Sequence, residues 1–209
     1  MTPDSNPPSG PPSVRLLVRK LERVRLGVAR TGSAAVFCPG QCRSMGVEIC
    51  RVCPRLSAIT EEAIVCTPAP APVAPAEALD DGPTGIDACV GDAMGYAALL
   101  VDAAVPAASL SEPSDTSGHF VAVVVDEEAR SLGLVDFAAA PELEECSVEE
   151  LARQVPPVRE AAPLAHAIDR MVHERARALP VVNDDGEVVG VLTDLDALRW
   201  VARREPPGR

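Results

Sequence analysis

An internal repeat in the C-terminal part of the chain places the strongest limit on how it can fold. Residues 87–139 align without gaps on residues 144–196, an offset of 57 positions. In both copies a valine-rich strand is followed by an acidic turn and then by a second apolar strand, which is the pattern of a hairpin. The aligned pairs include Val124 with Val181, Val125 with Val182, and Gly133 with Gly190. Repeats of this period indicate supersecondary units that pack on one another.

The second copy shows its secondary structure more clearly than the first. Apolar residues recur at helical spacing from Leu164 to Val172, and Pro163 suits a helix start. Two short strands follow at 179–182 and 188–192, and a closing helix is expected over 195–204, before the paired prolines. The order strand, helix, strand, strand, helix predicts an α/β (α+β) fold.

Shifts in composition divide the chain into segments. The stretch 67–86 is rich in proline and alanine, which favours an extended linker. The predicted organisation is a disordered start at 1–13, a small Cys-rich unit at 14–66, the linker at 67–86, repeat units at 87–143 and 144–204, and a tail at 205–209.

Charge and composition exclude several classes of protein. The net charge of -12 and an aromatic content of 2% argue against a nucleic-acid partner. No apolar run approaches the length of about 18 residues that a spanning helix needs, and no signal-peptide pattern opens the chain. We therefore expect a cytoplasmic protein that is not embedded in a membrane. The basic arm, residues 14–30, is either a docking arm or a solvated face.

Five cysteines in the N-terminal unit predict a metal site. They are Cys38, Cys42, Cys50, Cys53 and Cys66. The Cys50–Cys53 spacing is that of a turn in which two thiolates converge on one metal. The four ligands are either the first four cysteines, or the set that omits Cys42. Zinc and an iron–sulfur cluster are both compatible with such a set, and free or redox-active thiols are the alternative.

The segment RALPVVNDDGEVVGVLTDLDALRWVA, within the second copy, resembles the second half of a cystathionine β-synthase (CBS) domain. The match consists of an apolar-Pro-Val-Val strand, a turn with Asp-Gly, and Gly-x-x-Thr-x-x-Asp leading into a helix. The resemblance implies a pair of CBS βαββα repeats, packed through their sheets and covering about residues 87–204. It also implies dimerisation through the pair.

The resemblance further implies an adenosine-containing ligand, of the AMP, ADP, ATP or S-adenosylmethionine type. Thr193 and Asp196 would hold its phosphate and ribose, because a carboxylate can accept hydrogen bonds from adjacent ribose hydroxyls. The other residues expected at the ligand are Asp194, Ala178, Pro180, Val181 and Val158. The alternative role of Thr193 and Asp196 is to cap the closing helix.

The first copy departs from this pattern. Asp136 stands where Thr193 stands in the second copy, and Ala139 stands where Asp196 stands, so we expect at most one competent cleft. No catalytic motif occurs in the chain. The sequence therefore predicts a non-catalytic regulatory protein that senses an adenosine ligand for an unidentified partner. The second hypothesis is a metal- or redox-responsive adaptor in which the CBS pair is only a dimerising scaffold.

Overall fold

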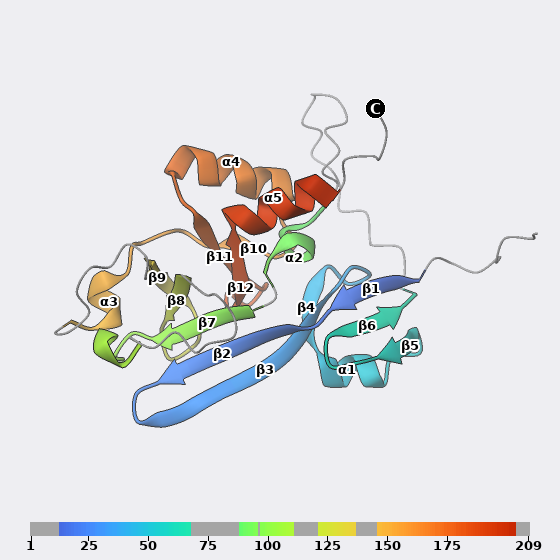
Figure 1. Cartoon of the computed structure of the whole chain (residues 1–209), viewed down its shortest axis with the longest axis horizontal. Helices are drawn as coiled ribbons and strands as arrows, with labels where there is room; N and C mark the ends of the chain where they lie inside the picture. The colour runs from blue at the N-terminus through green and yellow to red at the C-terminus, as the bar shows by residue number, and fades with distance from the viewer. Residues whose placement is uncertain (1–12, 68–87, 96, 111–120, 137–145, 204–209) are drawn as a thin grey trace, which may run out of the picture.

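The computed structural model describes residues 13–67, 88–95, 97–110, 121–136 and 146–203 (Figure 1). The predicted linker from residue 68 onward, the first twelve residues and the tail lie outside these ranges. No helix in the described residues is long and apolar enough to cross a membrane.

The second copy folds in the predicted order. It contains β10 (Val158–Arg159), α4 (Leu164–Glu174), β11 (Ala178–Val182), β12 (Val188–Thr193) and α5 (Asp194–Arg203). The strands form a sheet in which β10 runs parallel to β11 and β11 runs antiparallel to β12. A short helix, α3 (Val148–Leu151), precedes this sheet.

The first copy repeats the same strands. It contains α2 (Val90–Ala93), β7 (Ala97–Asp102), the 3-10 helix η1 (Ala107–Leu110), β8 (Val121–Val125) and β9 (Ser131–Asp136). Adding 57 to the bounds of β8 and β9 gives the bounds of β11 and β12, and the two hairpins carry their bulge at the same place. The repeat predicted from the sequence is therefore confirmed in these strands. Residues 111–120 of the first copy lie outside the described residues.

The two copies contact each other through equivalent backbone groups. Val90 N–H donates to Ala162 O at 2.8 Å, and Val148 N–H, near the same place in the second copy, donates to Val105 O at 3.0 Å. Because each bond runs from one copy to the other, the pair is related by an approximate two-fold axis. The backbone hydrogen bonds at the crossing therefore fix how the copies sit together.

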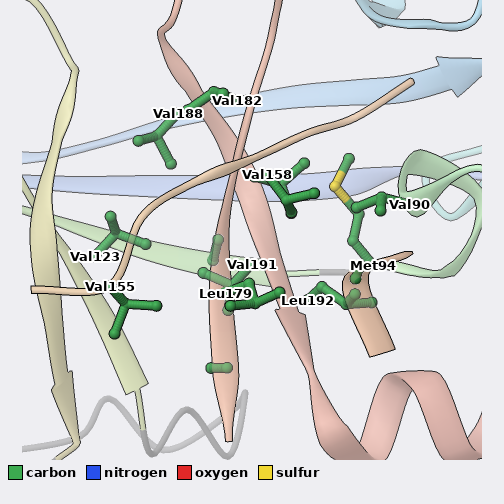
Figure 2. Close-up of a cluster of buried hydrophobic side chains, with 14 of the residues drawn as sticks. Val90, Met94, Val123, Val155, Val158, Leu179, Val182, Val188, Val191 and Leu192 are labelled. Atoms are coloured by element: carbon green, nitrogen blue, oxygen red, sulfur yellow. The ribbon is translucent and has the colours of Figure 1, made fainter. Parts of the chain in front are cut away.

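The larger of two apolar clusters is shared by both copies. Its members come from β7, β8 and β9 of the first copy and from β10, β11, β12 and α4 of the second. Figure 2 shows Met94 and Val90 beside Val158 and Leu192 in this core. Gly190 packs against Met94 in this core, since a Cβ on residue 190 would lie 2.8 Å from Met94 Sδ. The aligned glycine of the repeat thus lies at a closely packed position.

Strands from the N-terminal segment extend the first copy's sheet. They are β2 (Arg19–Arg25), β3 (Val28–Cys38) and β4 (Arg43–Gly46), in a six-stranded sheet of order β4-β3-β2-β7-β8-β9. β2 runs parallel to β7, with Lys20 opposite Ala97, and Figure 1 shows the two strands side by side. The expectation of a distinct Cys-rich unit at 14–66 is therefore not supported, because β2 to β4 belong to the sheet of the first copy.

The rest of the N-terminal segment forms a small sheet of its own. Its strands are β1 (Val14–Leu17), β5 (Leu56–Ile59) and β6 (Ala63–Cys66), in the order β1-β6-β5, and α1 (Val47–Arg51) links β4 to β5. The basic arm thus becomes β1 and β2. Arg23 Nε donates to Asp102 Oδ1 at 2.7 Å, so part of the arm's charge is paired within the chain, by an acid of β7.

Candidate functional site

Thr193 and Asp196 meet where β12 passes into α5. The backbone N–H and the hydroxyl of Thr193 both donate to Asp196 Oδ2, at 3.1 and 2.6 Å, and Asp196 N–H donates to Thr193 Oγ1 at 3.1 Å. This reciprocal arrangement is a capping box, which satisfies backbone donors at the helix start. One carboxylate oxygen of Asp196 is therefore held by Thr193, and the carboxylate is fixed in orientation.

A cavity of about 250 Å³ lies beside this capping box. Asp196 lines it, and so do residues of β1, of α2 and of α5. Gly95 also lines the cavity, and a Cβ there would lie 3.0 Å from Asp196 Oδ2. The absence of a side chain at residue 95 thus leaves the carboxylate uncrowded. The volume lies just below the range for small-molecule sites, which begins at about 300 Å³.

The structure separates the other predicted ligand residues from this cavity. Ala178, Pro180, Val181 and Val158 are buried within β10 and β11 and are not among the lining residues. Asp194 does not line the cavity either. Its carboxylate accepts from Leu195 N–H at 2.8 Å and pairs with Arg177 at 3.4 Å.

Sequence reasoning missed most of the residues that surround the cavity. Its apolar lining includes Phe37, Met94 and Trp200, and its arginines are Arg15, Arg19 and Arg199. Trp200 and Arg199 could have been found from helical spacing, since positions four and three residues after Asp196 share its face. Arg15 and Phe37 could not, because only the fold brings the N-terminal strands to α5.

Two buried charged residues, Arg19 and Glu160, lie near each other, and Arg19 lines the cavity. Arg19 is 7% exposed and donates through Nη2 to Gly91 O. Glu160, 3% exposed, accepts from Ser44 N–H at 2.8 Å. Burial raises the pKa of Glu160, whereas the hydrogen bonds from Ser44 and the nearby Arg19 cation act in the opposite direction. These contacts join the N-terminal strands to α2 and to the segment after β10.

Glu160→Gln should change how stability depends on pH. Because the pKa of Glu160 is raised in the folded chain above 4.5, its contribution to stability is largest below that value and is lost as pH rises through the folded-state pKa. Glutamine cannot ionise. The free energy of unfolding of the variant, relative to the parent chain, should therefore rise as the pH increases above about 4.5, as urea titrations would show. Glu61→Gln, at an exposed position, is the control; parallel pH curves for Glu160→Gln and the parent would contradict the assignment.

Four of the five N-terminal cysteines lie near one another. Burial raises the pKa of the Cys50 thiol, and the neighbouring Cys38, Cys53 and Cys66 raise it further. Cys66 is affected in the same way by Cys38 and Cys53. This is the predicted ligand set that omits Cys42.

Cys42 lies instead beside Cys89, a residue of the first copy. Burial, Asp92 and then Cys42 raise the pKa of Cys89 to about 11. Among the described residues, no group of three or more His, Cys, Asp or Glu side chains is arranged to hold a metal ion. The predicted zinc or iron–sulfur site at Cys38, Cys42, Cys50, Cys53 and Cys66 therefore finds no support in the structure.

The cleft of the first copy is only partly within the described residues. Asp136 ends β9 where Thr193 ends β12. A carboxylate at that position cannot donate a hydroxyl hydrogen bond as Thr193 does. Ala139, which aligns with Asp196, lies outside the described residues.

Comparisons with known proteins agree with this architecture. The CBS domain family matches residues 148–203, and no curated protein sequence matches the chain. The CBS domain pair of protein MJ0100, solved with 5′-methylthioadenosine and S-adenosylmethionine, is 21% identical with a TM-score of 0.50, and the match covers 56% of this chain and 98% of that one.

Two further solved structures have TM-scores of 0.49. One is CBSX2 in complex with AMP, 19% identical, with 56% of this chain and 99% of that chain covered. The other is protein MJ1004 of Methanocaldococcus jannaschii, 21% identical, with 56% of this chain covered; the match spans 60% of that protein's own chain. Residues 148–203 thus match the CBS domain, and the region around them has a fold similar to that of a solved CBS-domain pair.

Proposed function

We propose that this chain is a regulatory protein that binds one adenosine-containing ligand beside Asp196 and catalyses no reaction itself. The observation that carries the proposal is the Asp196 carboxylate, which Thr193 holds at the edge of a cavity. A fixed carboxylate can accept hydrogen bonds from two adjacent ribose hydroxyls. The capped start of α5 adds the positive end of a helix dipole to the same place.

The family match supports the class of ligand. Proteins with CBS pairs have been solved with AMP and with S-adenosylmethionine and 5′-methylthioadenosine, all of which contain adenosine. The Thr193-to-Asp196 segment lies inside the matched residues. AMP, ADP, ATP and S-adenosylmethionine are therefore the first compounds to test.

Regulation requires that the ligand bind two arrangements of the chain with different affinity. The cavity is bordered by α5, by α2 and by the N-terminal strands. A ligand that contacts all three would favour one relative position of these elements. The N-terminal strands would then transmit the change to the regulated partner.

We also propose that the chain forms a homodimer through α4 and α5. These helices expose large apolar side chains: Val172 is 71% exposed, Leu195 50%, Leu198 66% and Val201 42%. In α5 the three apolar residues lie on the side opposite Asp196 and Trp200. An apolar surface of this kind favours association with another protein surface.

Leu198→Glu should convert the dimer to a monomer. A charged side chain at the centre of an apolar interface is costly to bury, whereas the same change at an exposed site outside the interface is not. Val52→Glu, at a residue 82% exposed beside α1, is the matched control and should stay dimeric. Light scattering would measure both masses; a parent chain that is already monomeric at high concentration would contradict the proposed interface.

A thermal-shift panel with AMP, ADP, ATP and S-adenosylmethionine tests the proposed ligand class. A compound present at about 100 times its dissociation constant stabilises the folded chain by about 2.7 kcal/mol. A shift with at least one compound is expected. The absence of any shift at millimolar concentrations would remove the support for a ligand sensor.

The alternative function is a thiol-based adaptor, responsive to a metal or to redox state. The proximity of Cys38, Cys50, Cys53 and Cys66 favours it. A response to a metal is not favoured, because the described side chains include no group of three or more His, Cys, Asp or Glu residues arranged to hold a metal ion. Metal content of the purified chain, together with a thiol count before and after mild oxidation, would separate this function from ligand sensing.

A further inference from the structure

We infer that Arg15 and Arg199 bind the anionic end of the ligand, so that the cavity takes an adenosine 5′-phosphate in preference to adenosine or a sulfonium compound. The inference rests on the proposed function, since it concerns the same cavity. It adds a part of the chain that lies before the CBS match, because Arg15 belongs to β1.

The two arginines come from elements far apart in sequence. Arg15 is on β1, which pairs with β6 through Val65, and Arg199 is on α5, three residues after Asp196. Both line the cavity that Asp196 also lines. A ligand whose ribose lies at Asp196 would therefore have guanidinium groups within the same cavity.

The arginines that line the cavity differ in whether they already interact with other groups of the chain. Arg19 donates to Gly91 O and acts on the buried Glu160. Arg15 and Arg199 are both exposed, and neither forms an ion pair with any residue that the structure describes. Their charges are thus free to be matched by a ligand.

The charge of the cavity contrasts with that of the whole chain. Three arginines line it against two carboxylates, those of Asp92 and Asp196, although the chain as a whole carries a net charge of -12. Asp92 already accepts from Cys89 N–H at 3.1 Å in the cap of α2. A local excess of arginine in an acidic protein favours an anion, and guanidinium groups match phosphate oxygens in geometry as well as charge.

Trp200 and Phe37 supply the apolar part of the same cavity. Trp200 is four residues after Asp196 on α5, and Phe37 packs directly on Gly91 of α2. An adenine ring can stack on an aromatic face of this kind. The cavity thus combines an aromatic wall, a ribose acceptor and two arginines, which together match an adenosine phosphate.

The test compares AMP with adenosine by calorimetric titration of the full chain and two variants. Arg15→Gln should weaken AMP binding by about tenfold or more, because a charge-assisted contact is lost, and should leave adenosine binding unchanged. Arg30→Gln removes the same charge from an exposed site on β3 that does not line the cavity, and should bind AMP as the parent does. Trp200 is the only tryptophan, so its emission reports whether AMP enters this cavity.

The outcomes separate the inference from the function on which it rests. AMP binding that Arg15→Gln does not weaken, or that leaves Trp200 emission unchanged, would overturn the inference while the adenosine-ligand function stands. If Arg15→Gln and Arg30→Gln weakened AMP binding equally, the inference would also be overturned, because the effect would then come from net charge alone. If neither AMP nor adenosine binds the parent chain, the inference fails, and the function fails with it only if ADP, ATP and S-adenosylmethionine do not bind either.

Discussion

Arg19→Met should lower the free energy of unfolding by about 3 kcal/mol, the cost of leaving buried polar groups without their cation. Arg19 is buried, donates to Gly91 O, and lies near enough to Glu160 to lower its pKa. Methionine has a similar length but no charge and no donor. Both Gly91 O and the Glu160 carboxylate would lose this partner, and urea unfolding followed by circular dichroism would measure the loss.

Two controls distinguish this effect from a general loss of arginine. Arg30→Met changes an exposed arginine of the neighbouring strand β3 and should alter stability by less than about 0.5 kcal/mol. Adding Glu160→Gln to Arg19→Met should recover part of the loss, since the neutral amide no longer needs the cation. If Arg19→Met were as mild as Arg30→Met, the N-terminal strands would not be anchored to the CBS region through this residue.

Asp196→Asn should abolish stabilisation by the adenosine ligand while keeping the fold. In the parent chain, a ligand at about 100 times its dissociation constant is expected to add about 2.7 kcal/mol. Asparagine retains an oxygen that can accept from Thr193 N–H, so the cap of α5 is largely preserved. Compared with aspartate, asparagine lacks the negative charge and has only one oxygen that can accept hydrogen bonds from the ribose hydroxyls. Thermal unfolding with and without ligand would measure the difference.

Asparagine is a sharper substitution than alanine at this position. Asp196 Oδ2 accepts two hydrogen bonds from Thr193, so Asp196→Ala would also cost about 1 kcal/mol through the lost cap. Asp194→Asn is the matched control, because Asp194 lies two residues before Asp196 on the same helix but does not line the cavity. A ligand response that persists in Asp196→Asn would show that this carboxylate is only a helix cap.

Much of the fold of the two repeat copies could be predicted from local pattern. The hairpins follow from valine-rich runs on either side of acidic turns, and α4 follows from an apolar stripe that begins at Leu164. The offset of the repeat allowed the secondary structure predicted for the second copy, whose pattern is clearer, to be assigned to the first copy as well. Thr193 and Asp196 could be chosen because their segment resembles the second half of a CBS domain; their spacing of three residues by itself indicates only a helix cap.

The position of the N-terminal strands could not be predicted in this way. Lys20 of β2 pairs with Ala97 of β7, across a proline-rich stretch that reads as a domain boundary. Parallel pairing between strands so far apart leaves no periodic signal in the sequence. The basic residues of the arm were visible, but their partners, Asp102 and Glu160, were not.

The apolar residues predicted at the ligand remain a prediction, and the cavity beside Asp196 has other apolar walls. Ala178 and Val181 lie in the core, because β11 is the central strand of its sheet and is buried along its whole length. The cavity is lined by Phe37 and Trp200 instead. Only the packing of the N-terminal strands against α2 and α5 creates that cavity.

The most direct test of the proposed function is the stoichiometry of nucleotide binding, measured by calorimetric titration of the full chain with AMP and with ATP. The second copy supplies Thr193 and Asp196, whereas the aligned positions of the first copy are Asp136 and Ala139. We therefore expect saturable binding of one nucleotide per chain. No measurable binding of either nucleotide, or binding of two per chain, would contradict a sensor with a single cleft at Asp196.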